Sequence, residues 1–248
     1  MAFALGIRAL AVSFLFAVAC APSAAPRAAD TPGSGTTVAN APTPRSSTLV
    51  IAIRVEPTSL NSRLQSPGVT LTTTRRLFNA NLVIFDQRGQ PQPYLAAEMP
   101  QLQTDSWRVL PDGRMETSYK LQPNLVWHDG APLTASDFAF AQLVYATPEL
   151  GAAHLPPANL IDEVTAADPS TVVINWKRPY ALAGLLTEGF RPLPKHLLET
   201  SFQTAVPETF AALPYWTHEF VGSGPFRLDR WEPGRSSRAA PSTVTYWA

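Results

Sequence analysis

Charge and cysteine are both scarce in this sequence of 248 residues. Charged residues make up 15 %, the formal net charge is zero and lysine is rare, so the chain lacks the basic stripe that nucleic-acid binding needs. The only cysteine is Cys20, which excludes an intrachain disulfide and argues against a thiolate metal site. The four histidines are isolated and form no His-Glu-x-x-His pattern. The sequence therefore predicts no metal site and no cofactor.

Long hydrophobic runs are missing except for one short stretch near the start. Residues 9–19 are apolar or small throughout, which is too short for a stable transmembrane helix and typical of a signal-peptide core. The stretch ends at Cys20 in a pattern that resembles a bacterial lipobox. We therefore predict a lipoprotein signal peptide and lipobox over 1–20, with Cys20 as the lipidation site. The alternative is an ordinary signal peptide cleaved at an Ala-x-Ala site.

Proline is abundant, with 25 in the chain. Residues 21–47 consist almost entirely of Ala, Pro, Ser, Thr and Gly, a composition that cannot bury a core. We expect this segment to be a linker that tethers a soluble domain to a membrane surface. The remainder, about 200 residues, suffices for one sizeable core or two small lobes.

The expected elements alternate between strands and helices, which indicates a mixed α/β domain. Apolar and alternating runs predict strands at 49–53, 82–85, 107–110, 115–121, 161–165 and 171–176. Helical spacing predicts helices at 72–81, 138–146, 182–186 and 194–199. The glycines of 222–224 predict a turn into a strand that reaches Trp231.

The stretch 126–138, Val-Trp-His-Asp-Gly-Ala-Pro-Leu-Thr-Ala-Ser-Asp-Phe, is the most informative part of the sequence. Asp129-Gly130 predicts a tight turn, because glycine tolerates positive φ. Thr134 is a good N-cap and Asp137 follows three residues later, as in a capping box. The pattern therefore predicts a strand, a turn and the capped start of a helix.

These residues also resemble a known signature, Trp-His-Asp-Gly-x-Pro-(Leu/Phe)-Thr-Ala-x-Asp, of bacterial extracellular solute-binding proteins, family 5, which serve peptide- and nickel-type ABC importers. Three more segments resemble motifs of the same family in the same order. They are Leu-Val-Ile-Ala with Glu-Pro-Thr-Ser-Leu-Asn at 49–61, Arg-Leu-Phe-Asn-Ala-Asn-Leu at 76–82, and Val-Gly-Ser-Gly-Pro-Phe with Trp-Glu-Pro-Gly at 221–234.

The resemblance implies an α/β, periplasmic-binding-protein-like (type II) fold. Residues 48–234 are expected to be a partial solute-binding domain, namely the first lobe with its inserted subdomain. Family members are usually about twice as long, so this resemblance implies that the second lobe is missing and that the chain is an incomplete copy. The segment 235–248 does not look like the apolar strand expected after Trp-x-Pro-Gly, and we expect it to be an aberrant or disordered tail.

The resemblance further implies a lipid-anchored, non-enzymatic substrate-binding component of an ABC importer for peptides or related solutes. It would lie on the outer face of the bacterial cytoplasmic membrane and deliver its ligand to an ABC permease. Ligands of open α/β sheets bind at loops at strand ends. The family motifs place two such candidates here, Glu56, Pro57 and Thr58 in one loop and Phe78 and Asn79 in the other. The alternative for both is that they only shape loop and helix contacts.

Two other functions stay open on the sequence. One is a secreted hydrolase that uses His128 and Asp129. The structural alternative is that His128 is a turn histidine whose ring packs near Trp127. The other is a structural lipoprotein fragment that binds nothing.

Overall fold

The computed structural model describes residues 50, 56–57, 59–61 and 76–242. By its contacts the chain divides into two units, 1–50 and 51–248, and everything described below lies in the second. The predicted signal peptide, the linker, Cys20, Thr58 and most of the expected strand at 49–53 lie outside the described residues. Among the described residues, no helix has the length and apolar character to cross a membrane.

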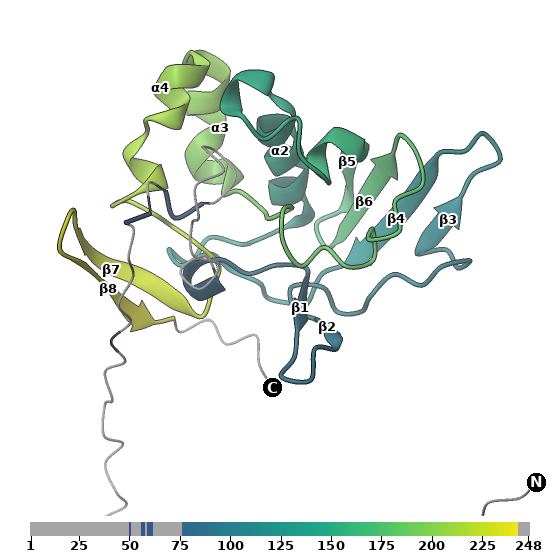
Figure 1. Ribbon diagram of the computed structural model, residues 1–248, viewed down its shortest axis with the longest axis horizontal. Helices are drawn as coiled ribbons and strands as arrows, with labels where there is room; N and C mark the ends of the chain where they lie inside the picture. Colours follow the sequence, from purple (N-terminus) through teal and green to yellow (C-terminus); the bar gives the residue numbers. More distant parts are fainter. Residues whose placement is uncertain (1–49, 51–55, 58, 62–75, 243–248) are drawn as a thin grey trace, which may run out of the picture. The chain divides into compact units, whose positions relative to one another are not determined.

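The described elements form a mixed α/β arrangement (Figure 1). In chain order they are β1 Val83–Phe85, β2 Pro91–Pro93, β3 Trp107–Val109, β4 Met115–Lys120, α2 Ala135–Ala146, the 3-10 helices η1 Pro148–Leu150 and η2 Ala158–Leu160, β5 Ile161–Asp168, β6 Thr171–Trp176, α3 Lys195–Thr204, α4 Pro207–Ala211, the 3-10 helix η3 Pro214–Trp216, β7 Phe226–Glu232 and β8 Ser236–Pro241.

The main sheet has four antiparallel strands in the order β3-β4-β6-β5. The four strands predicted over 107–121 and 161–176 are confirmed: β3 pairs with β4 with Trp107 opposite Thr117, and β5 pairs with β6. Residues of β4 alternate, with Met115, Thr117 and Tyr119 buried, as a half-buried strand requires. Helix α2 packs on β5 and β6, so the sheet and this helix enclose one part of the core.

Helix α2 begins where the sequence predicts. Its N-cap is Thr134, and the carboxylate of Asp137 accepts a hydrogen bond from the Thr134 N–H at 2.8 Å. The other carboxylate oxygen of Asp137 accepts from the backbone N–H of Lys195 at 3.0 Å. Asp137 is 4 % exposed, and this burial raises its pKa above the ordinary value. One side chain therefore caps α2 and fixes the start of α3.

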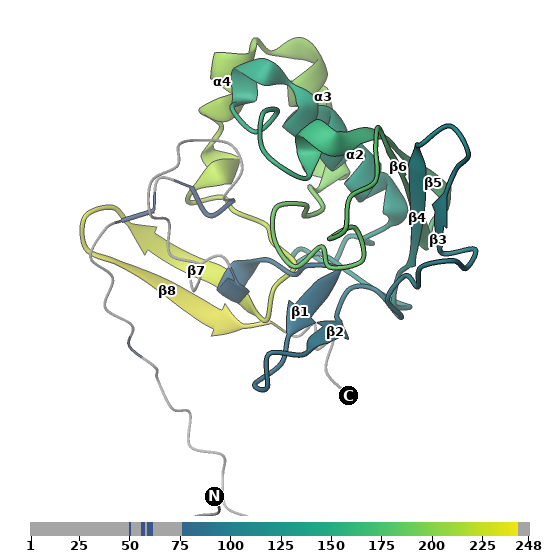
Figure 2. The same cartoon turned by 45° about the vertical axis from the view of Figure 1, so that its right-hand side comes forward.

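Two shorter sheets complete the described part of the chain (Figures 1 and 2). Strands β1 and β2 form one hairpin and β7 and β8 form another. Strand β8 corrects one expectation, because Ser236–Pro241, part of the segment 235–248 predicted to be an aberrant or disordered tail, pairs in register with β7. Alternation of apolar residues is not required for this pairing, since the backbone provides the hydrogen bonds.

Two helix predictions are corrected. In the expected helix at 182–186, residues 182–184 form a turn and 185–186 are not helical; a Cβ on Gly184 would lie 2.7 Å from the Trp107 ring, so the backbone there is closely packed. In the expected helix at 72–81, residues 76–78 are helical and 79–81 are not.

Candidate functional site

The glycine segment 222–224 crosses directly over the backbone of Phe78. The N–H groups of Ser223 and Gly224 both donate to the Phe78 carbonyl, at 3.1 and 3.0 Å. A Cβ on Gly222 would lie 2.0 Å from that same oxygen, and a Cβ on Gly224 would lie 2.5 Å from the backbone nitrogen of Asn79. Only glycine fits at this distance. Two of the sequence motifs, about 145 residues apart, therefore meet in one junction.

His128 holds this junction from the other side. Its backbone N–H donates to the Gly222 carbonyl at 2.9 Å. Its ring accepts from the Gly222 N–H at Nδ1, 3.2 Å, and Nε2 lies 2.8 Å from the Gly224 carbonyl. Burial lowers the pKa of His128, with the positive charge of Arg227 acting in the same direction.

The pairing required for a hydrolase is not formed. The Asp129 carboxylate lies 2.8 Å from Nε2 of His196, not of His128, and also accepts from the Ala131 N–H at 3.1 Å. The ring near Trp127 is likewise that of His196, with centroids 6.4 Å apart. His128 and Asp129 therefore have separate partners, and the expected packing of His128 on Trp127 is replaced by hydrogen bonds to the glycine segment.

Phe78 and Asn79 are part of the interior. Phe78 is 1 % exposed and Asn79 is 7 % exposed. The Asn79 side-chain amide donates to the Leu60 carbonyl at 3.0 Å, and the Leu60 N–H donates to the Trp216 carbonyl at 2.9 Å. These contacts favour the alternative that both residues shape loop and helix contacts, and their contact with a solute stays a prediction.

Glu56 clips its loop to the turn that follows β7. One carboxylate oxygen accepts from Nε1 of Trp231 at 2.7 Å, and the other accepts from the Gly234 N–H at 2.8 Å. These two hydrogen bonds, the one from Trp231 first, lower the pKa of Glu56. The carboxylate is therefore ionised at neutral pH. The Glu56 side chain thus joins two of the predicted motifs through one indole N–H and one backbone N–H.

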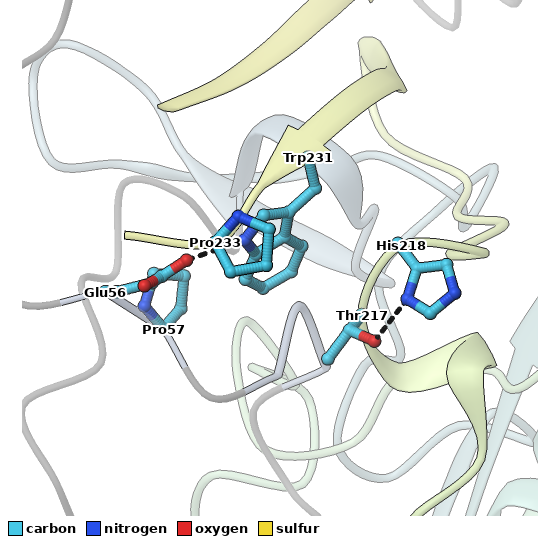
Figure 3. Close-up of a pocket in the computed structure, with 6 residues that line it drawn as sticks. All are labelled: Glu56, Pro57, Thr217, His218, Trp231 and Pro233. Atoms are coloured by element: carbon cyan, nitrogen blue, oxygen red, sulfur yellow. Dashed lines mark hydrogen bonds between the residues drawn. The ribbon is translucent and has the colours of Figure 1, made fainter. Parts of the chain in front are cut away.

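A hollow of about 300 Å³ opens beside this clip (Figure 3). Its lining residues come from three separate segments: Glu56, Pro57, Thr217, His218, Trp231 and Pro233. Two prolines and an indole supply apolar surface, and Thr217 Oγ1 lies 3.2 Å from Nδ1 of His218. This set can hold a small organic group through contact, with a carboxylate and an imidazole nearby. Glu56 and Pro57 were predicted as site residues, and the hollow places them together.

The remaining lining residues were missed by the sequence reasoning. Trp231 and Pro233 lie in the Trp-Glu-Pro-Gly motif, whose position could have signalled them, whereas Thr217 and His218 carry no sequence signal. A second, wider hollow of about 810 Å³ runs along β3 between Leu102 and Leu110, and none of the predicted site residues line it. Within the described ranges, no group of three or more His, Cys, Asp and Glu side chains is arranged to hold a metal ion.

Comparison with known families decides which proteins this arrangement belongs with. The family of bacterial extracellular solute-binding proteins, family 5 (middle region), matches residues 98–248. The chain belongs to this family. The match confirms the resemblance drawn from the motifs, and since family 5 proteins bind solutes without catalysis, it also confirms the prediction that the chain is not an enzyme.

Individual relatives agree with the family. The dipeptide-binding protein DppE of Bacillus subtilis is 24 % identical over 209 residues, covering 77 % of this chain and 35 % of DppE. NikZ of Campylobacter jejuni, solved with Ni(L-His), has a TM-score of 0.62 at 23 % identity and covers 79 % of this chain and 35 % of NikZ. The oligopeptide-binding protein of Thermus thermophilus, solved with a pentapeptide, has a TM-score of 0.62 at 22 % identity, covering 73 % and 34 %.

The chain thus spans about a third of the length of these relatives. Its α/β arrangement matches the corresponding third of the two solved binding proteins, which confirms the predicted fold at that level.

Proposed function

We propose that this chain provides part of the substrate-binding component of an ABC importer for peptides or related solutes. Family membership supports the proposal, as do the ligands named for its relatives: a dipeptide, a pentapeptide and a nickel–histidine complex. The observation in this chain that carries it is the Glu56 clip. It joins two family motifs and makes them one wall of a hollow.

In this proposal residues 48–234 are part of the first lobe with its inserted subdomain. The chain leaves the Phe78 junction after Ala80, builds the four-stranded sheet with α2, and returns to the same junction at Gly222. A segment that leaves and re-enters at one point has the topology of an insertion. The hollow beside Glu56 then belongs to the first lobe, and an opposing lobe would close over the solute.

The hollow would take one end or one side chain of the solute. Pro57, Pro233 and Trp231 would exclude water from the group that enters, and burial of apolar area contributes about 25 cal/mol per Å². Glu56 would hold the wall in place rather than bind the solute through a free oxygen, because each of its oxygens already accepts a hydrogen bond. Thr58, next to Pro57 in the sequence, stays a proposed contact.

We place the protein on the outer face of the cytoplasmic membrane, anchored through a lipid on Cys20 and tethered by the linker 21–47. The support is the lipobox-like sequence before Cys20 and membership of an extracellular family. The partner that receives the solute would be an ABC permease in the same membrane.

Binding can be measured by NMR titration of the chain with the dipeptide Ala-Ala, a pentapeptide and nickel–histidine. The described residues supply one wall, so we expect a Kd of about 1 mM and chemical-shift changes at the Trp231 indole. Substituting His218→Ala should weaken binding about tenfold, or about 1.4 kcal/mol. The matched control His154→Ala changes an exposed histidine that does not line the hollow and should leave binding intact. If none of the three probes binds, a structural role without a ligand is favoured instead.

A further inference from the structure

The imidazole of His128 is held by hydrogen bonds at both nitrogens. A carbonyl oxygen can only accept, so the 2.8 Å contact from Nε2 to the Gly224 carbonyl requires a proton on Nε2. The Gly222 N–H can only donate, so the 3.2 Å contact at Nδ1 requires an unprotonated nitrogen. The geometry thus fits one state of the ring, the neutral form with its proton on Nε2.

A second proton on this ring would remove one of these hydrogen bonds. The Nδ1–H would point at the Gly222 N–H, so two donors would face each other. The glycine segment cannot move toward Phe78 to relieve this, because the two backbones are already in close contact. A Cβ added to Gly222 would lie only 2.0 Å from the Phe78 carbonyl oxygen. The segment would therefore move away from Phe78 and lengthen the bonds from Ser223 and Gly224 to that carbonyl.

The junction is connected to the hollow through a short series of hydrogen bonds. Next to the Phe78 carbonyl, the Asn79 amide holds the carbonyl of Leu60, and the Leu60 N–H holds the carbonyl of Trp216. Leu60 follows Pro57 by three positions in the sequence, and Trp216 directly precedes Thr217 and His218. Two of the three segments that line the hollow are thus positioned by the junction that His128 holds.

The charged groups that face the His128 ring are few. Arg227 on β7 disfavours the imidazolium and Asp129 on the adjacent turn favours it. Asp129 is itself paired with His196 on α3, which reduces what it can contribute to His128. Burial is the largest effect and lowers the pKa of His128 below its ordinary value of 6.5; the hydrogen bond to the Gly224 carbonyl opposes it, and Arg227 acts with it.

We propose that His128 is a positioning residue whose neutral ring holds the 222–224 segment, and that its protonation loosens the hollow and weakens solute binding in acid. The part about the solute rests on the proposed function; the part about the ring and the glycine segment does not.

NMR of the full chain tests the ring directly. Histidine ring spectra recorded from about pH 7.5 to about pH 4.5 should show the Nε2–H tautomer and a His128 pKa below 6.5. The amides of Gly222, Gly224 and Leu60 should shift with the same midpoint. An Nδ1–H tautomer, a pKa at or above 6.5, or amides that do not follow the His128 titration would overturn the proposal.

A variant separates titration from mere packing. His128→Gln keeps a donor and an acceptor but cannot titrate, so it should retain the neutral-pH amide positions and lose their acid shift. The control His154→Gln, at an exposed histidine outside the junction, should keep the shift. If His128→Gln fails to fold, the wild-type titration still decides.

The link to the solute is read separately with the dipeptide Ala-Ala. Wild-type binding should be at least about threefold weaker below the His128 midpoint measured by NMR than near pH 7, and His128→Gln should lose most of that difference. Binding that is independent of pH would overturn the link to the hollow. If the dipeptide binds at no pH, the proposed function fails while the ring titration still tests His128.

Discussion

Placing one methyl group on Gly222 is the sharpest perturbation that the structure offers. The backbone at Gly222 lies outside the left-handed region, so Gly222→Ala acts through contact alone. The new Cβ would lie 2.0 Å from the Phe78 carbonyl oxygen and 2.8 Å from the Phe220 ring, whereas ordinary contacts lie at 3.4–4 Å. The backbone oxygen cannot rotate aside as a flexible side chain can, so the whole segment must move by more than 1 Å.

The cost follows from what that movement disrupts. Two hydrogen bonds to the Phe78 carbonyl would be lost or lengthened, at about 0.5–1.5 kcal/mol each, and overpacking adds about 1–3 kcal/mol. We therefore expect Gly222→Ala to lower the free energy of unfolding by about 2–6 kcal/mol. For a chain of this size each kcal/mol lowers Tm by about 2–4 °C.

Urea unfolding followed by tryptophan fluorescence and by circular dichroism measures this change. The matched control is Gly113→Ala, where φ is +85° and an added Cβ meets nothing within 4 Å, so only backbone strain of about 1–2 kcal/mol is expected. If Gly222→Ala costs no more than Gly113→Ala, the close approach of the glycine segment to Phe78 is wrong.

Three further substitutions test other parts of the account. Gly130→Val should lower the free energy of unfolding by about 1–3 kcal/mol, because φ is +88° with open space around it; an unchanged Tm would contradict the turn. Asp137→Ala removes the acceptor for the N–H groups of Thr134 and Lys195 and should cost about 1–3 kcal/mol in urea unfolding. Since the pKa of Asp137 is raised by burial, its contribution to the free energy of unfolding should be larger at low pH and decline as pH rises through that pKa. A difference in this free energy between wild type and Asp137→Ala that grows with pH would refute this. Cys20→Ser should move the protein from the detergent phase to the aqueous phase, and equal partitioning of both forms would exclude the anchor.

Elements with local signals were predictable from the sequence. The Thr134–Asp137 cap and the apolar spacing from Phe138 to Tyr145 predicted α2, whose members at those positions are buried. Strands β3 and β4 were predicted from their own residues, and the turn between them contains Asp112-Gly113, where φ of Gly113 is positive. In such cases the residues that decide the structure are neighbours in the chain, so a short window contains the whole signal.

One error came where a distant contact decides. The segment around Leu182 has helical spacing, yet glycine in a helix interior costs about 1 kcal/mol, and packing of Gly184 against the Trp107 ring favours turns. The sequence pattern around Leu182 does not contain Trp107. Strand β8 was missed for another reason: its partner β7 precedes it directly, but β8 itself has no alternating apolar pattern.

The candidate site shows the same division. Glu56 and Pro57 were reached through a motif, but the hollow exists because Trp231, 175 residues away, donates to Glu56. Asn79 was singled out because amides suit peptide backbones, and in the fold its side-chain amide donates to the buried carbonyl of Leu60. A buried carbonyl must find a donor, and which donor it finds is a property of the folded chain.

The Phe78 junction also determines the order in which parts of the chain can fold. Its hydrogen bonds join positions separated by more than a hundred residues, and loops of that length close slowly compared with hairpins and helices. The sheet β3-β4-β6-β5 and helix α2 lie wholly between the two sides of the junction, so they can form while the junction is still open. On a ribosome, residues 76–80 must wait for 222–224 to be synthesised before the Phe78 carbonyl receives its donors. Until then the Phe78 carbonyl lacks these donors, and the bonds from Trp231 and Gly234 to Glu56 and the pairing of β8 form later still, because those residues follow in the chain.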